Sequence, residues 1–484
     1  MRPALVNAAS LSRQLNGWRG PDGEPAYRRL SEALKLMILD GRLSLNARLP
    51  GERRLAETLG VSRITVSAAL DRLRADGFVV SRTGSGSVTA LPASPASRSV
   101  RRLDGPMQRD DAPGVVDMAS AAMPADEQVH AAYARALEAL PAHLPSRGYE
   151  PVGIEVLRRA VAERYAADGL TTKPEQIVVS AGALSGLALL LRAATRPGDR
   201  AVVEHPGYPH ALDALVQAGL DLSPVAMTAQ GWDMDGMLAA IARVRPRLIY
   251  LIGAHQNPTG HVLSAEDEAA LAAAAARVGA LLVLDDTLRE LWFDRPPPPP
   301  LDHGPHVVRL GSTSKPYWGG LRVGWLRAHA EVVEAVVRHR PSLDLGVPVM
   351  EQLAAAVLLA GDPAPLAARR RIIVQREAHL RARLAEVLPE WKTRRPDGGL
   401  SLWVELPRPD STRLALAAPD HGVRIPPGTR FGVNGAFDRF IRLPFSREEA
   451  DLDRAVEGLA AAWRSLDRAG PRKARLLADP EPVI

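Results

Sequence analysis

The sequence contains no cysteine, and lysine is scarce, with five lysines against 56 arginines. The lack of cysteine excludes disulfide bonds, thiolate metal sites and cysteine nucleophiles. There is no basic-then-apolar leader pattern at the N-terminus. The apolar runs are short, since the run 184–191 stops at Arg192, far below the length that spans a bilayer. We therefore expect a cytoplasmic protein.

At 484 residues the chain is long enough for two or more domains and a large core. Its charge is unevenly distributed. Residues 1–90 carry 14 Lys and Arg against 8 Asp and Glu, whereas the remainder carries 47 of each sign. The whole formal excess of +6 thus lies in the N-terminal part, which suits a polyanion-binding head on a neutral body, although an excess of this size also arises by chance.

Regular spacing first becomes visible after residues 1–24, which we expect to be irregular. Apolar residues recur at helical spacing over 30–38, and Pro50-Gly51 opens a second helix that ends at Leu59. Ser62 is a suitable N-cap for a third helix, which runs to Asp76. Apolar residues on both sides of Thr-Gly-Ser-Gly then predict a hairpin. Three helices and a hairpin over residues 25–90 form a winged helix-turn-helix plan.

The segment 91–115 is rich in Pro, Ser, Arg and Asp and is predicted to be a flexible linker. From 116 to 467, short apolar runs alternate with helical stretches, and 468–484 is predicted to be a disordered tail. Buried strands are predicted at Ile177–Val179, Ala201–Val203, Leu248–Ile252, Leu281–Leu284 and Val307–Leu310. This alternation predicts an α/β fold with a largely parallel sheet covered on both faces.

Lys315 stands out among the few lysines. It lies in Gly-Ser-Thr-Ser-Lys-Pro-Tyr-Trp-Gly-Gly-Leu-Arg-Val-Gly-Trp, between two apolar segments. A lysine kept where arginine is otherwise preferred indicates an amine that must lose its proton, as in a Schiff base with an aldehyde cofactor such as pyridoxal phosphate. The neighbouring hydroxyls and Arg322 would suit a phosphate. The alternative is an ordinary surface lysine on a loop.

Several N-terminal segments resemble the winged-helix domain of the GntR family of transcription regulators. They are Leu-Pro-Gly-Glu-Arg-Arg-Leu-Ala, Leu-Gly-Val-Ser-Arg-Ile-Thr-Val, Asp-Gly-Phe and Gly-Ser-Gly, within residues 25–90. The resemblance implies that DNA is contacted by Arg53, Arg63 and Thr65, and that Gly84 lies in the wing near the minor groove. Gly51 and Ser67 depart from residues common in the family, Ser and Arg, so operator preference is expected to differ.

A second resemblance, over about residues 116–465, is to the fold-type I aminotransferases. Its motifs are Gly-Tyr-Glu-Pro-Val-Gly, Ser-Ala-Gly-Ala, Glu-His-Pro-Gly-Tyr-Pro, His-Gln-Asn-Pro-Thr-Gly, an aspartate after a buried strand, the Lys315 segment and Ile-Arg-Leu-Pro-Phe, in this order. The resemblance implies a mixed, mostly parallel sheet with a small C-terminal subdomain, and pyridoxal 5'-phosphate as the cofactor.

The resemblance also implies a role for each matching residue. Lys315 would form the Schiff base, Asp285 would pair with the ring nitrogen, and Asn257 would bond the phenolic oxygen. The remaining cofactor contacts would be Tyr208 stacked on the ring; Ser312, Ser314, Arg322, Ala183 and Leu184 around the phosphate; and Tyr149 reaching the phosphate of a neighbouring subunit. Arg442 would bind a substrate carboxylate. As alternatives, Asp285 could be a strand-end loop acid and Tyr208 a packing residue.

Two departures from the aminotransferase pattern bear on activity. Thr287 stands where many relatives have a Tyr that tunes the phenolic oxygen, and Leu184 stands where Gln is frequent. The first argues against efficient transamination. The second leaves the phosphate to backbone amides and Arg322.

A GntR head on an aminotransferase-like body is the arrangement of the MocR group of regulators. This resemblance implies a head-to-tail homodimer that binds operator DNA. Our hypothesis is a regulator in which a small amino-acid-like effector, or pyridoxal phosphate itself, acts at Lys315 to switch DNA binding. The alternatives are an active aminotransferase with an accessory DNA-binding domain, and a degenerate body that only dimerises.

Overall fold

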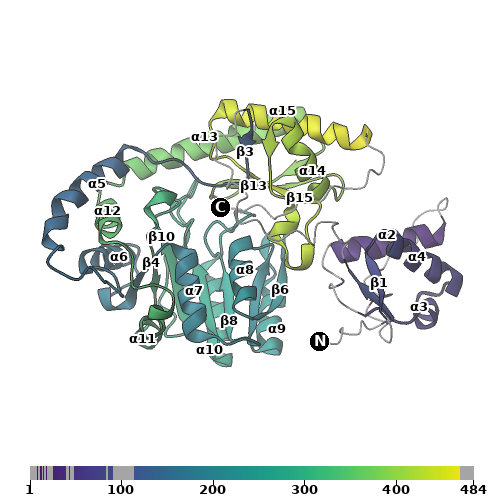
Figure 1. Cartoon of the computed structure of the whole chain (residues 1–484), viewed down its shortest axis with the longest axis horizontal. Helices are drawn as coiled ribbons and strands as arrows, with labels where there is room; N and C mark the ends of the chain where they lie inside the picture. The colour runs from purple at the N-terminus through teal and green to yellow at the C-terminus, as the bar shows by residue number, and fades with distance from the viewer. Residues whose placement is uncertain are drawn as a thin grey trace.

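The structure is a computed structural model of the chain. It describes residues 25–39, 48–82, 86–90 and 114–468, together with the single positions 8, 11, 12, 15, 18 and 43. The first three ranges and the single positions form an N-terminal head, and the last range forms a larger body (Figure 1). The predicted wing residue Gly84, most of the predicted linker and nearly all of the predicted tail lie outside the described residues.

The head has the predicted three helices and hairpin. They are α2 (Ala26–Leu39), α3 (Glu52–Leu59), α4 (Arg63–Ala75), β1 (Val79–Arg82) and β2 (Gly86–Thr89), the two strands being antiparallel. Helix α3 ends at Gly60, which takes the left-handed conformation at φ 64°. Helix α4 begins where the Ser62 hydroxyl accepts a hydrogen bond from the Thr65 amide at 3.0 Å.

One prediction for the head is wrong. Residues 1–24 were expected to be irregular, yet Ala8, Leu11 and Ser12 are helical, and Leu11 and Leu15 are buried in the core of the head. Positions 8, 11 and 15 follow the i, i+3, i+7 spacing of an amphipathic helix. That signal was present in the sequence, but it was too short to stand out from its polar surroundings.

The body is built on an eight-stranded sheet of order β4-β11-β10-β9-β8-β5-β6-β7. Its strands are β4 (Ile177–Ser180), β5 (Arg200–His205), β6 (Asp221–Thr228), β7 (Gly231–Trp232), β8 (Leu248–Leu251), β9 (Leu281–Asp285), β10 (Val307–Ser312) and β11 (Gly324–Arg327). Only β7 and β11 run against the others. The sheet is therefore mixed and mostly parallel, as predicted.

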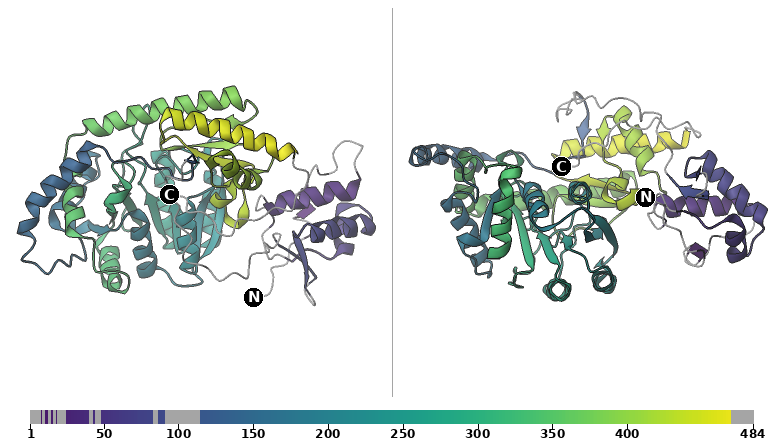
Figure 2. Two further views of the ribbon diagram at one scale, coloured as in Figure 1. Left: turned by 45° about the horizontal axis from the view of Figure 1, so that its top comes forward. Right: turned by 60° about the horizontal axis from the view of Figure 1, so that its bottom comes forward.

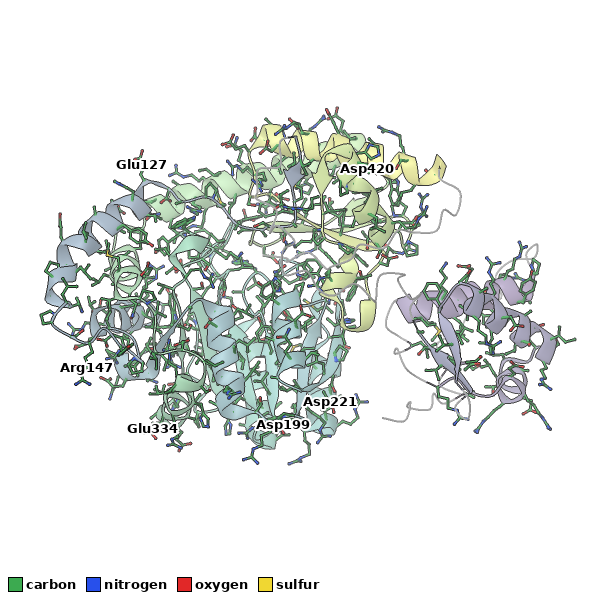
Figure 3. The ribbon with its side chains drawn as sticks, viewed as in Figure 1. Glu127, Arg147, Asp199, Asp221, Glu334 and Asp420 are labelled. Carbon is green, nitrogen blue, oxygen red and sulfur yellow. The ribbon has the colours of Figure 1, made fainter. Side chains whose placement is uncertain are left out.

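Consecutive strand residues pack into different layers, because side chains along a strand alternate between the faces of a sheet. Tyr250 packs with α7 (Ala183–Ala194) and α8 (Pro209–Gln217), whereas its neighbours Ile249 and Leu251 pack against α9 (Met234–Val244) and α10 (Ala265–Val278). A third layer, formed by α5 (Glu127–Ala139), α6 (Glu155–Ala167) and α12 (Val349–Leu359), encloses the β4 edge. Charged side chains such as Glu127, Arg147 and Glu334 project from the outer surface of the body (Figure 3).

A smaller C-terminal lobe follows α11 (Ala330–His339) and α12. Its sheet contains β12 (Lys392–Thr393), β13 (Ser401–Glu405) and β15 (Phe440–Pro444), all antiparallel. The long helices α13 (Ala364–Val387) and α15 (Glu449–Arg468) pack side by side over this lobe, which also holds α14 (Ser411–Ala417) (Figure 2). The short strand β3 (Val116–Asp117) pairs with β14 (Val423–Arg424) and joins the start of the body to this lobe. None of the described helices is both long and apolar enough to cross a bilayer.

Candidate functional site

A cavity of about 490 Å³ lies at the carboxyl ends of the central strands, where α/β sheets usually bind ligands. It brings together residues that are far apart in the sequence. The lining includes Ala183, Leu184, Tyr208, Tyr250, Asn257, Asp285, Thr287, Ser312, Ser314, Lys315, Arg322 and Arg442. Every cofactor and substrate residue predicted from the sequence except Tyr149 therefore lines one cavity.

Lys315 lies in the loop after β10, and its Nζ donates a hydrogen bond to the Ala121 carbonyl at 3.0 Å. Burial, helped by the nearby cations Arg442 and Arg322 and opposed by Asp285, lowers the pKa of Lys315 to about 8. A substantial fraction of this amine is thus neutral near physiological pH. The surface-lysine alternative does not fit a half-buried amine that lines a cavity and bonds to a main-chain carbonyl.

Asp285 ends strand β9 and is held from two sides. Its Oδ2 accepts a hydrogen bond from the Tyr250 hydroxyl at 2.8 Å, and its Oδ1 accepts one from the Thr287 amide at 2.9 Å. Burial raises the pKa of Asp285, and these donors partly offset that rise. Burial and the carboxylate raise the pKa of Tyr250 well above its ordinary value, so its hydroxyl remains a donor.

Arg322 marks an anion-binding corner of the cavity. Its Nη2 donates to the Ala181 carbonyl at 2.7 Å, just before the N-terminus of α7. Gly182 is the N-cap of that helix at φ 91°, and a Cβ there would come within 3.1 Å of the Arg322 guanidinium. The Ser312 and Ser314 hydroxyls lie on the same side, 2.9 Å apart. Hydroxyls, a guanidinium and a helix N-terminus are the usual components of a phosphate site.

Asn257 and Tyr208 line the cavity from the loops after β8 and β5. The Asn257 Oδ1 is buried and has no hydrogen-bond partner among the described residues. Tyr208 lies just before α8 with His210 edge-on to its ring at 5.5 Å, and burial raises the pKa of Tyr208 to about 12. A buried amide with a free polar atom is the kind of group that a bound molecule satisfies.

Arg442 is the least compensated charge in the site. It lies on β15 with no exposed surface, and its guanidinium faces the Phe431 ring at 5.2 Å. One guanidinium nitrogen donates to the Ala119 carbonyl, but Nε and Nη1 have no partner among the described residues. Burial lowers the pKa of Arg442 to about 10. A buried cation with free donors at a cavity is suited to bind an incoming carboxylate.

Of the predicted contacts, one lies outside this cavity and another lacks a polar side chain. Tyr149 lies outside it with 66% of its side chain exposed, so it is free to reach another molecule. Leu184 lines the cavity but is still 37% exposed, and it offers no side-chain donor. A phosphate at this corner would therefore rely on Arg322, the serines and backbone amides.

In the head, the predicted DNA contacts lie at the start of α3 and α4. The side chains of Arg53 and Arg63 are 88% and 74% exposed and form ion pairs with Glu57 and Glu52 at 3.2 and 3.7 Å. Thr65 differs, because its hydroxyl lies 2.8 Å from the Ser62 hydroxyl and takes part in the helix cap. Arg53 and Arg63 are thus available to a ligand, whereas Thr65 also has a structural task.

Comparison with protein families agrees with both parts of the chain. The model for bacterial regulatory proteins of the gntR family matches residues 26–88, and the model for aminotransferase class I and II matches residues 113–459. The HTH-type transcriptional regulator YdcR of Escherichia coli K12, itself described as uncharacterized, is 31% identical over 86% of this chain and 94% of its own length. The chain belongs to the MocR-type GntR regulators.

Other relatives are named as a regulator or as a transaminase. The probable rhizopine catabolism regulatory protein MocR of Rhizobium meliloti is 31% identical over 84% of this chain and 87% of its own. The 2-aminoadipate transaminase of Thermus thermophilus is 32% identical over 67% and 80%. Among solved structures, LysN of the same species, complexed with N-(5'-phosphopyridoxyl)-L-leucine, superposes with TM-score 0.67 at 28% identity, covering 76% and 96% of the two chains.

Membership of this aminotransferase class and the phosphopyridoxyl-bound neighbour support pyridoxal 5'-phosphate as the cofactor of the MocR-type body. Sequence reasoning missed Tyr250, which the apolar run 248–252 hid as one more strand residue. The available signal was a single hydroxyl-bearing residue in that run. A buried Tyr needs a partner for its hydroxyl, and the end of the adjacent strand β9 supplies one.

Proposed function

We propose that the protein is a transcription regulator whose operator binding is switched by pyridoxal phosphate, or by an amino compound that reacts with it, at Lys315. The observation that carries the proposal is the cavity itself. It places a half-buried lysine of lowered pKa beside a buried aspartate, a phosphate-type corner and an arginine with free donors, in a chain that has a GntR head. A body that served only for dimerisation would have no need of this set.

The described residues fit the cofactor on physical grounds. Arg322, Ser312, Ser314 and the amides around Ala183 would hold the phosphate, the side-chain nitrogen of Asn257 would donate to the phenolic oxygen, and Tyr208 would cover the ring. Asp285, whose carboxylate accepts hydrogen bonds from Tyr250 and Thr287, would pair with the protonated ring nitrogen. When bound, pyridoxal phosphate supplies an aldehyde carbon that a primary amine attacks. The neutral Lys315 amine is the group of this chain that does so.

An effector with an amino group and one carboxylate fits the rest of the cavity. Its carboxylate would take the free Nε and Nη1 donors of Arg442, and its amine would replace Lys315 on the cofactor. The Lys315 side chain would then no longer be tethered to the cofactor and would be free to take another position. We propose this displacement as the local event of the switch. If amino acids never change the bound form, pyridoxal phosphate itself is the effector.

We also propose a head-to-tail homodimer, in which the exposed Tyr149 completes the phosphate site of the partner. The proposal keeps the predicted division into a head at 25–90, a linker at 91–115, a body at 116–467 and a tail from 468. Two heads fix the spacing of the DNA half-sites that are read together, so a change in the body would alter operator affinity. Such a regulator would act in the cytoplasm, where its DNA lies.

A working aminotransferase is the second candidate, favoured by the complete lysine, aspartate and arginine set and by the 32% identity to a Thermus transaminase. Thr287 opposes it, because no tyrosine hydroxyl at that position tunes the phenolic oxygen. Single-turnover conversion of the bound cofactor by each amino acid, followed by assay of the keto acid, separates the two. Sustained multiple turnover would favour the enzyme.

The test of the proposed function is operator binding by the full-length protein with and without pyridoxal phosphate. Genomic fragments selected by the purified protein supply the DNA, and a gel or anisotropy titration supplies the affinity. We expect the cofactor, alone or with an amino acid, to change the affinity by about tenfold, within the usual range of allosteric coupling. Specific DNA binding that is indifferent to both would contradict the switch, and failure to select any DNA would contradict the regulator.

The lowered pKa of Lys315 predicts the pH dependence of cofactor capture. Only the neutral amine reacts, and lowering its pKa to about 8 makes it mostly neutral above that pH. The rate of capture by the apo-protein should rise between about pH 7 and pH 8 and level off near pH 9. Stopped-flow absorbance would measure it. A rate that keeps rising tenfold per unit to about pH 10 would show an ordinary lysine.

Tyr250→Phe should weaken cofactor binding by about tenfold, since a hydrogen bond to a charged group contributes about 1.5–3 kcal/mol. Without the hydroxyl, Asp285 loses one of the donors that hold its pKa down, and it pairs less well with a protonated ring nitrogen. Titration of the apo-protein with pyridoxal phosphate gives the dissociation constant. The control is Tyr165→Phe, which removes a buried hydroxyl bonded to Trp325 at 3.2 Å, outside this cavity. Equal affinities of both variants for pyridoxal phosphate would show that the Tyr250 hydroxyl does not contribute to cofactor binding.

A further inference from the structure

Ile64 is the most exposed large hydrophobic side chain among the described residues, at 81%. A single exposed isoleucine needs no explanation on its own, because much of any protein surface is apolar. The position of Ile64 is what requires one. It lies in the first turn of α4, directly between Arg63 and Thr65, on the helix that a winged helix-turn-helix places in the major groove.

Helix geometry turns Ile64 away from the rest of the head. The buried stripe of α4 consists of Val66, Ala69, Leu70 and Leu73. With about 100° between successive residues, the centre of that stripe lies opposite Ile64. The Ile64 side chain therefore points away from the core of the head, toward the molecule that binds this face of α4.

The surroundings of Ile64 favour a polyanion as the molecule that α4 faces. Arg63 precedes it in the chain, Arg53 lines the same surface hollow as Arg63, and their side chains are 74% and 88% exposed. Their ion pairs with Glu57 and Glu52 are solvent-exposed or partly so, and pairs of this kind contribute little, so phosphates could replace the carboxylates readily. Together with the +6 charge of residues 1–90, these arginines bring α4 to a nucleic acid duplex.

Isoleucine can recognise only one feature of a base edge. Its side chain neither donates nor accepts hydrogen bonds, and the only apolar group in the major groove is the 5-methyl group of thymine. We propose that Ile64 packs against a thymine methyl and specifies a T·A pair in each half-site of the operator. This inference rests on the proposed DNA-binding function and adds the base that the position selects.

Asp71 limits the contact to the start of the helix. It lies two turns after Ile64 on the same face, 66% exposed, and is paired with Arg74 Nη1 at 2.5 Å. An acidic side chain at this position offers a phosphate no donor, unlike Arg63 in the first turn. The groove-facing part of α4 is therefore its first turns, where Ile64 is the outward apolar group.

The experiment compares Ile64→Ala with wild-type protein on operator DNA selected in vitro by the full-length wild type. Each thymine is replaced in turn by deoxyuridine, which removes only the methyl group. We expect one thymine per half-site at which deoxyuridine weakens wild-type binding by about three- to fivefold, the usual effect of losing an apolar contact of this size. Ile64→Ala should weaken binding to the natural operator by a similar factor and should not respond to deoxyuridine there.

Two variants make the comparison specific. Ile64→Val keeps branched methyl groups and should retain most of the response, whereas Val216→Ala truncates a side chain of the body that is 57% exposed and should change nothing. Because Ile64 is exposed, its variants should have the same melting temperature as the wild type. The inference is overturned if no thymine responds to loss of its methyl group, or if Ile64→Ala weakens selected and random DNA equally. Failure of the wild type to select any DNA would instead defeat the proposed function on which the inference rests.

Discussion

Replacing Lys315 by alanine is expected to abolish the effect of pyridoxal phosphate on operator affinity while leaving cofactor-free DNA binding intact. The head shares no residue with the cavity, so DNA affinity in the absence of cofactor should match that of the wild type. Without the amine no covalent bond forms, and dialysis should remove the cofactor. A coupling of about tenfold in the wild type should fall to within about twofold of unity in the variant.

The control for this prediction is Lys173→Ala, which removes an exposed amine outside the cavity and should behave as the wild type. Lys315→Met keeps the length of the side chain without the amine, so its loss of coupling could not be attributed to an empty space in the core. If Lys315→Ala and Lys315→Met both retain coupling, the cofactor acts without covalent attachment, and the switch proposed at Lys315 is wrong.

Local motifs were enough to predict most of the cavity. Asn257, Asp285 and Lys315 each belong to a short segment with its own signature, and each segment follows a buried strand. Because parallel strands place their carboxyl ends at one edge of a sheet, the three could be expected to meet there. The sheet order confirms the reason, since β8, β9 and β10 are neighbours.

Contacts between separate segments could not be predicted in the same way. The bond from Tyr250 to Asp285 depends on the register of β8 against β9, which pairs Tyr250 with Val283 and Leu251 with Leu284. The bond from Arg442 to the Ala119 carbonyl joins the C-terminal lobe to a segment 323 residues earlier in the sequence. Neither leaves a mark in local spacing. Leu11 shows the opposite failure, since its helical spacing was visible but too brief to be trusted.

Arg442→Met is expected to remove carboxylate effectors from the cavity without destabilising the protein. The binding loss should be about 100-fold or more, because the variant loses a charge-assisted pair in a dry site. Replacing most buried arginines lowers the free energy of unfolding, whereas replacing Arg442 should raise it. In the free protein this guanidinium is buried, bonded to one carbonyl and otherwise unpaired, so an apolar side chain of similar length should raise the free energy of unfolding by about 1 kcal/mol.

Arg340→Met is the matched control, since Arg340 is equally buried but is paired with a carboxylate, and only its Nη2 lacks a partner among the described residues. It bonds to Asp344 Oδ1 at 2.6 Å and to the Pro151 and Val179 carbonyls at 2.7 and 2.6 Å. Its replacement should lower the free energy of unfolding by about 3 kcal/mol, because two carbonyls lose their donor and Asp344 loses its cationic partner.

Urea denaturation of both apo-variants, with a panel of amino acids titrated into the cofactor-loaded proteins, would test the pair. If Arg442→Met were destabilised as strongly as Arg340→Met and its amino acid binding were unchanged, Arg442 would be a structural residue. The opposite pattern would mean that the protein keeps an energetically unfavourable buried charge because an incoming carboxylate requires it.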